Sequence, residues 1–169
     1  TIVIGNPLVV SSVTYEHVLG HIFWGAIIGL GTLSIRYIII GGSFAIFLDS
    51  DHLLQFLDIE LVSRMSHSIP FTIIVTIVFF LILRGKDLRI CAVAFAAVLS
   101  HLAFDIFLAD IAFNSSTAFP LFSPFILENT EFGGLDWLGI QIIGVSIVAI
   151  VSYLVKRKEI HVQSNLTKT

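Results

Sequence analysis

The stretch Tyr37–His52, YIIIGGSFAIFLDSDH, decides how the rest of the chain is interpreted. Its apolar run continues without interruption to Leu48, and two carboxylates and an imidazole follow at Asp49, Asp51 and His52. Ionisable groups at the end of an apolar helix are costly and usually mark function, although they can also mark the place where a membrane helix meets water. The histidines elsewhere in the chain favour the functional interpretation.

Composition indicates a membrane protein of one domain. The chain has 169 residues, 56% of them hydrophobic and only 12% charged, and its mean hydropathy is +0.99. Its successive apolar stretches are long enough for membrane spans, and backbone amides in lipid need internal partners, which favours helices. No basic patch with interleaved aromatic residues suggests nucleic acid binding. We therefore expect an all-α, polytopic membrane bundle of about five transmembrane helices, with membrane lipid as its surroundings.

The apolar runs define the predicted spans and the turns between them. A single transmembrane domain, residues 1–158, is followed by a polar tail, residues 159–169, which we expect to be disordered. An aromatic loop, residues 110–136, is expected to lie on the membrane surface. The predicted spans are residues 17–33, 37–54, 68–83, 88–108 and 137–155.

Charge distribution predicts the orientation of this bundle. Five spans place the two termini on opposite sides, and cytoplasmic loops collect Lys and Arg. Arg64 is the one basic residue on the predicted outer side, whereas eight lie on the other side. These eight are Arg36, Arg84, Lys86, Arg89, Lys156, Arg157, Lys158 and Lys168. The C-terminus is therefore expected in the cytoplasm and the N-terminus outside, in the plasma or inner membrane.

Most acids and histidines fall at the predicted outer end. His101 and Asp105 are four residues apart and so share one helix face, as do His17 and His21. The pair on the fourth span suits two ligands of a metal cluster, and the alternative is a buried hydrogen bond between them. A mixed set of imidazoles and carboxylates suits zinc, with manganese or iron as alternatives. Paired ions of this kind occur in hydrolases that act on phosphoesters.

Five short motifs together resemble a known family, the LexA-regulated, membrane-bound metal-dependent hydrolases, which are similar to the phospholipase C and P1 nuclease group. The Leu48–His52 segment matches the family's P-D-x-D-H, with Leu48 in place of proline, and Ser100–Asp105 matches S-H-x-x-x-D. The other three are His21–Ala26, Ser63–Ser68 and Phe119–Phe125, which resemble its histidine-to-glycine, H-R-G-x-T-H-S and proline–aromatic motifs.

The resemblance implies a metal-dependent hydrolase. Together with the donor set, it leads us to expect two or more divalent ions, with zinc as the first candidate. The metal ligands would be His21, Asp49, Asp51, His67, His101 and Asp105, with His17 and His52 as further candidates. Asp51 and Arg64 would also serve catalysis, Arg64 by gripping an anionic group. The resemblance does not identify a substrate. The position of the predicted site, level with lipid headgroups, suggests a phosphoester such as a phospholipid or a lipid-linked phosphate at the outer interface.

One motif departs from the family pattern and keeps a second hypothesis open. Ser63 stands where the family has its first histidine, and one residue is missing between Arg64 and His67. The alternative is therefore a degenerate, non-catalytic subunit that binds metal within a membrane complex and has other proteins of that complex as partners.

Overall fold

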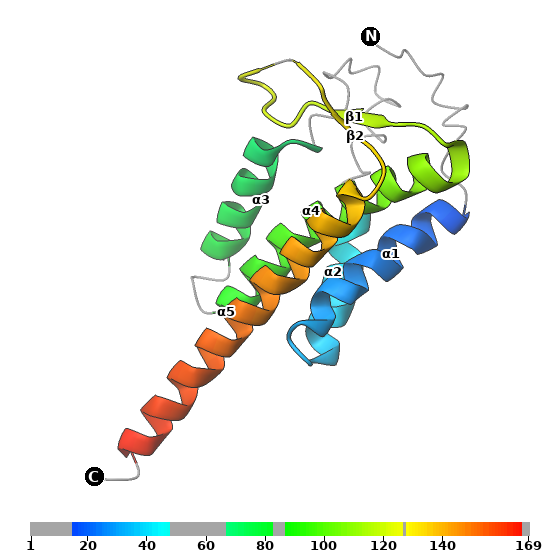
Figure 1. Cartoon of the computed structure of the whole chain (residues 1–169). Coiled ribbons are helices and arrows are strands. Elements are labelled where there is room, and N and C mark those ends of the chain that lie inside the picture. The colour runs from blue at the N-terminus through cyan, green and yellow to red at the C-terminus, as the bar shows by residue number, and fades with distance from the viewer. Residues whose placement is uncertain (1–14, 48–66, 83–86, 127, 167–169) are drawn as a thin grey trace.

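The computed structural model describes residues 15–47, 67–82, 87–126 and 128–166. These residues form five α-helices and one two-stranded antiparallel sheet (Figure 1). The elements in chain order are α1 (Tyr15–Leu30), α2 (Ile35–Phe47), α3 (Ile69–Ile82), α4 (Leu88–Phe113), β1 (Thr117–Phe119), β2 (Thr130–Phe132) and α5 (Asp136–Leu166). The predicted all-α class is confirmed, with the small β1–β2 hairpin as an addition.

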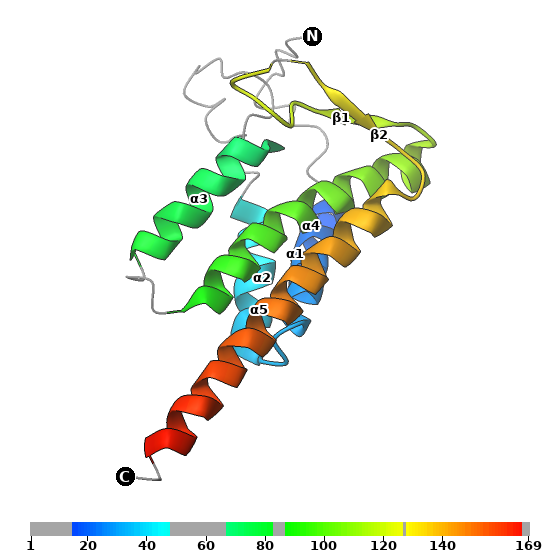
Figure 2. The ribbon, with the colours of Figure 1, turned by 60° about the vertical axis from the view of Figure 1, so that its left-hand side comes forward.

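The central element is α4, against which the other four helices pack (Figures 1 and 2). Its N-terminal half is rich in small residues, and Ala92, Ala96 and Ala97 are all buried. Small side chains allow neighbouring helices to approach closely, which is typical of helix packing in membranes. The core around this half also contains Ile28 of α1 and Val148 of α5. The position of α4 brings residues from every other helix close to its surface.

Local capping residues mark the start of α3 and both ends of α4. The backbone N–H of Phe71 donates to the hydroxyl of Ser68 (3.3 Å), which satisfies one unpaired amide at the start of α3. The carboxylate of Asp87 accepts from the backbone N–H of Arg89 (3.2 Å) at the start of α4. Asn114, in the left-handed conformation with φ 47°, ends the same helix.

Two expectations about regions outside the spans need correction. The tail is not disordered where the structure describes it, because α5 continues to Leu166. Its residues 156–159 are Lys, Arg, Lys and Glu, which favour helices, and extending an existing helix costs little. The loop expected from residue 110 is shorter, because α4 continues to Phe113 and the β1–β2 hairpin occupies part of the remainder.

Among the described residues, two helices are long and apolar enough to cross a membrane. These are α4, over Leu88–Ile111, and α5; the first is mostly buried in the bundle and the second is mostly exposed. The helices α1, α2 and α3 are apolar but shorter. Two such helices are weak support for membrane association, because core helices of soluble proteins share these properties. The five-span bundle and its orientation therefore stay predictions.

Candidate metal centre

Five of the side chains singled out in the sequence lie together at one end of the bundle. His17 and His21 come from the first two turns of α1, and His101 and Asp105 come from successive turns of α4. His67 lies just before α3, where the backbone N–H of Ile69 donates to the carbonyl of Leu121 (2.8 Å), next to the hairpin. Three separate parts of the chain thus supply one cluster.

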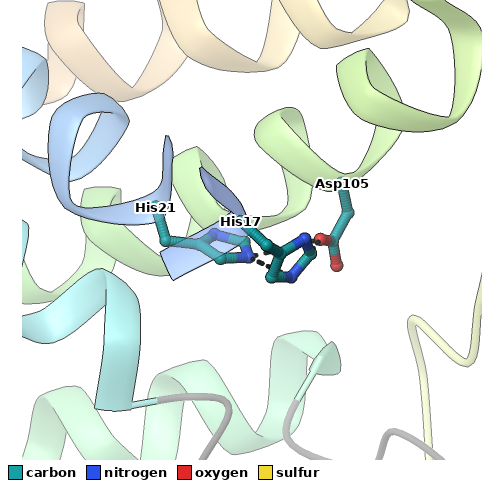
Figure 3. Close-up of side chains that lie close together, drawn as sticks. All are labelled: His17, His21 and Asp105. Atoms are coloured by element: carbon teal, nitrogen blue, oxygen red, sulfur yellow. Dashed lines mark hydrogen bonds and ion pairs between the residues drawn. The ribbon is translucent and has the colours of Figure 1, made fainter. Parts of the chain in front are cut away.

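The first half of the cluster joins α1 to α4 (Figure 3). The Nε2 atoms of His17 and His21 are 3.0 Å apart. Both face the same carboxylate oxygen, because Oδ1 of Asp105 lies 4.0 Å from Nε2 of His17 and 3.4 Å from Nε2 of His21. These three groups could hold one metal ion.

The second half joins His67 to α4 through the other oxygen of the same carboxylate. The Nε2 atoms of His67 and His101 are 2.9 Å apart, and Oδ2 of Asp105 lies 3.5 Å from the first and 3.7 Å from the second. The distance of 3.7 Å is too long for a hydrogen bond between His101 and Asp105, which disfavours the simple buried pair considered from the sequence. These three groups could hold a second ion.

The spacing of the donor atoms fits metal coordination. Tetrahedral zinc with bonds of about 2.1 Å places its ligand atoms about 3.4 Å apart. The ligand atoms of the two groups are separated by 2.9 to 4.0 Å, which spans that value. Asp105 is common to both groups and offers one oxygen to each. A bridging carboxylate between two pairs of imidazoles is a donor set suited to two divalent ions.

A backbone carbonyl orients one of the imidazoles toward the cluster. Nδ1 of His101 lies 2.7 Å from the carbonyl oxygen of Ala45 in α2, and a carbonyl can only accept. His101 must therefore carry its proton on Nδ1, which leaves the lone pair of Nε2 directed at the other ligands. This arrangement, with one nitrogen donating to a backbone carbonyl and the other directed at the remaining ligands, is the usual one for metal-ligating histidines.

Aromatic rings support the cluster and limit its exposure. The rings of His21 and His101 stack at 3.9 Å, and Phe119 of β1 stacks on His67 with ring centroids 5.6 Å apart. His21, His67 and His101 are almost completely buried, whereas the side chains of His17 and Asp105 are 17% and 12% exposed. Access to the cluster is therefore from the side on which His17 and Asp105 lie.

Several predicted site residues cannot be placed in this geometry. Asp49, Asp51, His52 and Arg64 lie outside the described residues. Their roles stay predictions from the sequence.

Two groups that contact the histidine cluster were not predicted from the sequence. The carbonyl of Ala45 carries no sequence signal, because every residue has one. Phe119 belongs to the proline–aromatic motif, and its aromatic side chain close to Pro120 was the only available signal.

No protein-family model, curated protein or solved structure matches this chain.

Proposed function

We propose that this chain is an integral membrane protein whose histidine–aspartate cluster holds two divalent metal ions, with zinc as the first candidate. With these ions the chain hydrolyses a phosphoester at the extracytoplasmic membrane interface. The observation that carries the proposal is the position of Asp105, with one carboxylate oxygen facing each of two histidine pairs. Paired ions sharing a carboxylate are common in enzymes that transfer phosphoryl groups to water, where they polarise the phosphate and activate water. The resemblance stated from the sequence favours the same reaction class.

The apolar surface supports the membrane part of the proposal. In α3, which is described throughout and carries no charged residue, Thr72 is the only buried residue. Large side chains are exposed along it and along α5, including Ile74, Leu81, Ile142 and Ile150. Soluble proteins rarely expose contiguous apolar surfaces of this kind, whereas lipid covers them without cost.

The chain's own groups suggest how a phosphoester would be handled. The cluster is exposed on the side of His17 and Asp105, so an anionic group could approach the ions there. Arg64 is the only basic residue on the predicted outer side and is the candidate for holding that group. Asp51 is the candidate for accepting a proton from the attacking water. A site level with lipid headgroups favours a phospholipid or a lipid-linked phosphate.

The alternative is a non-catalytic subunit that uses the same ions to hold its helices together. It is favoured by the burial of His21, His67 and His101, because structural metal sites are closed whereas catalytic sites keep a position open. The departure at Ser63 from the family motif favours it as well.

Elemental analysis of the purified chain tests the metal centre. We expect about two zinc ions per chain, close to none in Asp105→Ala, and about one in His17→Ala, since this change removes a ligand of one group only. His161→Ala, at the exposed end of α5, is the matched control and should keep the full content. Binding should weaken as the pH falls through about 6 to 7, because histidine ligands must be deprotonated. Full metal content in Asp105→Ala would contradict a shared carboxylate.

Hydrolysis assays on the same preparations separate the enzyme from the structural subunit. Detergent-solubilised phospholipids and generic phosphomonoesters and phosphodiesters would be offered, with a chelator control. Arg64→Ala should keep its metal and lose roughly tenfold to hundredfold in rate, as expected for a charge-assisted contact. A fully metallated chain without chelator-sensitive hydrolysis would support the structural subunit instead.

A further inference from the structure

A cavity of about 630 Å³ lies at the opposite end of the bundle from the metal centre. The turn between α1 and α2 (residues 31–34) forms one wall, and α5 between Ala149 and Lys156 forms the facing wall. Arg89, in the first turn of α4, completes the lining. Arg89 and Asp105 are about 24 Å apart along α4 at 1.5 Å per residue, so this cavity is separate from the histidine cluster.

Three basic side chains line the cavity, those of Arg36, Arg89 and Lys156. Only Arg89 forms ion pairs with nearby carboxylates among the described residues. Arg89 pairs with Asp87 (3.3 Å) and with Glu159 (3.2 Å). Arg36 and Lys156 have no carboxylate partner in the part of the chain that the structure describes, and both are exposed. The cavity thus offers two uncompensated positive charges from two different helices.

Further donors in the cavity suit an anion with several oxygens. Ser152 lines the cavity, and its buried hydroxyl has no hydrogen-bond partner among the described residues. The helix α2 begins at the cavity with Ile35, and its first turn contains no acidic residue. The positive end of this helix dipole favours a bound anion, and its first backbone amides can donate to one. A phosphate group has several oxygen atoms, so it could accept hydrogen bonds from the basic side chains, the hydroxyl and the amides together.

We propose that this cavity binds a phosphate group between Arg36, Lys156 and Ser152. The same chemistry is available from an anionic phospholipid and from free phosphate. The rim favours the lipid, because Leu33 and Ile35 are 93% and 70% exposed beside the cations, so that acyl chains could cover them. Basic pockets between helices on the cytoplasmic side of a membrane typically bind anionic headgroups, and this is the side predicted for these residues.

Titration calorimetry on the full chain in a non-ionic detergent tests the proposal. The probes are short-chain phosphatidylglycerol, the matched phosphatidylcholine and inorganic phosphate. We expect saturable binding of phosphatidylglycerol to the parent chain. The double variant Arg36→Gln/Lys156→Gln should bind it with an affinity about tenfold or more lower, because the loss of one charge-assisted contact lowers affinity by about tenfold. Arg157→Gln, next in sequence on α5 but outside the cavity lining, is the matched control and should bind like the parent chain.

A second variant separates a built site from general attraction to a basic surface. Ser152→Leu leaves every charge in place but fills the cavity, so it should weaken binding as the double variant does. If inorganic phosphate binds as tightly as phosphatidylglycerol and loses this binding in the same variants, that result would support the phosphate site and identify free phosphate as its ligand. Unchanged binding in the double variant, equal loss in Arg157→Gln, or no binding of either anionic probe would overturn the proposal.

Discussion

Asp87 shows how one residue between two helices contributes to stability. Its carboxylate accepts from the hydroxyl of Tyr37 in α2 (2.7 Å) and from the Nε of Arg89 in α4 (3.3 Å). Burial alone would raise the pKa of Asp87, but the hydrogen bonds from Tyr37 and Arg89 outweigh burial and hold this pKa below its ordinary value. The charged form is therefore the one that the fold stabilises.

We expect Asp87→Asn to destabilise the protein at neutral pH but not in acid. A carboxylate whose pKa falls on folding stabilises the fold above its unfolded pKa of about 3.9, and the contribution is lost as the pH drops through the lower folded value. Because asparagine also caps helices, the change removes the charge of Asp87 but keeps a capping side chain. We expect the lost charge to lower the free energy of unfolding by about 1–2 kcal/mol. Unfolding midpoints from pH 7 to about pH 3 should converge for variant and parent.

The control for this charge effect is Glu128→Gln at an exposed position, which should leave the midpoint unchanged throughout. A constant difference between Asp87→Asn and the parent chain across the whole pH range would show that the charge of Asp87 is not the cause.

At the scale of elements, the crossing of α1 and α2 depends on glycines. A Cβ added at Gly25 would collide with the carbonyl of Gly41, and a Cβ added at Gly41 would collide with the carbonyl of Gly25. The helices therefore touch backbone to backbone, a close approach that glycine permits. This contact also places Ala45, whose carbonyl orients His101. Helix packing and the geometry of the candidate metal centre are thus linked.

Gly25→Ala should lower both the stability and the metal content. We expect a loss of about 1–3 kcal/mol, the usual cost of inserting a methyl group into a tight contact, because α2 must move away from α1. Thermal unfolding in detergent and elemental analysis would measure the two effects. The matched control is Gly139→Ala in α5, where an added Cβ meets nothing within 4 Å among the described residues. This change should stabilise the helix slightly. Equal stability and equal metal content in Gly25→Ala and Gly139→Ala would contradict the link between helix packing and metal binding.

At the scale of the whole molecule, the two ends of the bundle differ in chemistry. Histidines and Asp105 gather at one end, whereas Arg36, Arg89 and Lys156 surround a cavity at the other. The long helix α5 extends past the rest of the bundle and carries the C-terminal end away from the hairpin (Figure 2). The positive-inside rule predicts that the basic end faces the cytoplasm.

Site-directed labelling tests this orientation in intact membranes. Cysteines placed at Ser115 and Gln163, both exposed, in a Cys91→Ala background should react from opposite sides. The Ser115 position should be reached from outside, because it follows the C-terminus of α4, which is the end of this helix predicted to face outward. Labelling of both positions from one side would contradict the five-span topology and the outward-facing site.

The sequence by itself determined the properties that depend on local geometry. Helical periodicity is local, so spacings of four residues were enough to predict that His17 and His21 share a face, as do His101 and Asp105. The continuous apolar runs predicted helices, because lipid or a protein core requires internally bonded backbone. The helical extension of the tail to Leu166 does not follow from its polar composition, which is equally typical of a disordered tail, although its residues have high helix propensity.

Only the tertiary structure decided which of these faces meet and at what distance. The sharing of Asp105 between two histidine pairs depends on how closely α1 and the start of α3 approach α4. That approach is determined by the packing of side chains far apart in sequence, such as the stacking of Phe119 on His67. The Ala45 carbonyl and the basic cavity have the same origin, because backbone groups and the spaces between helices acquire their partners only when the helices pack.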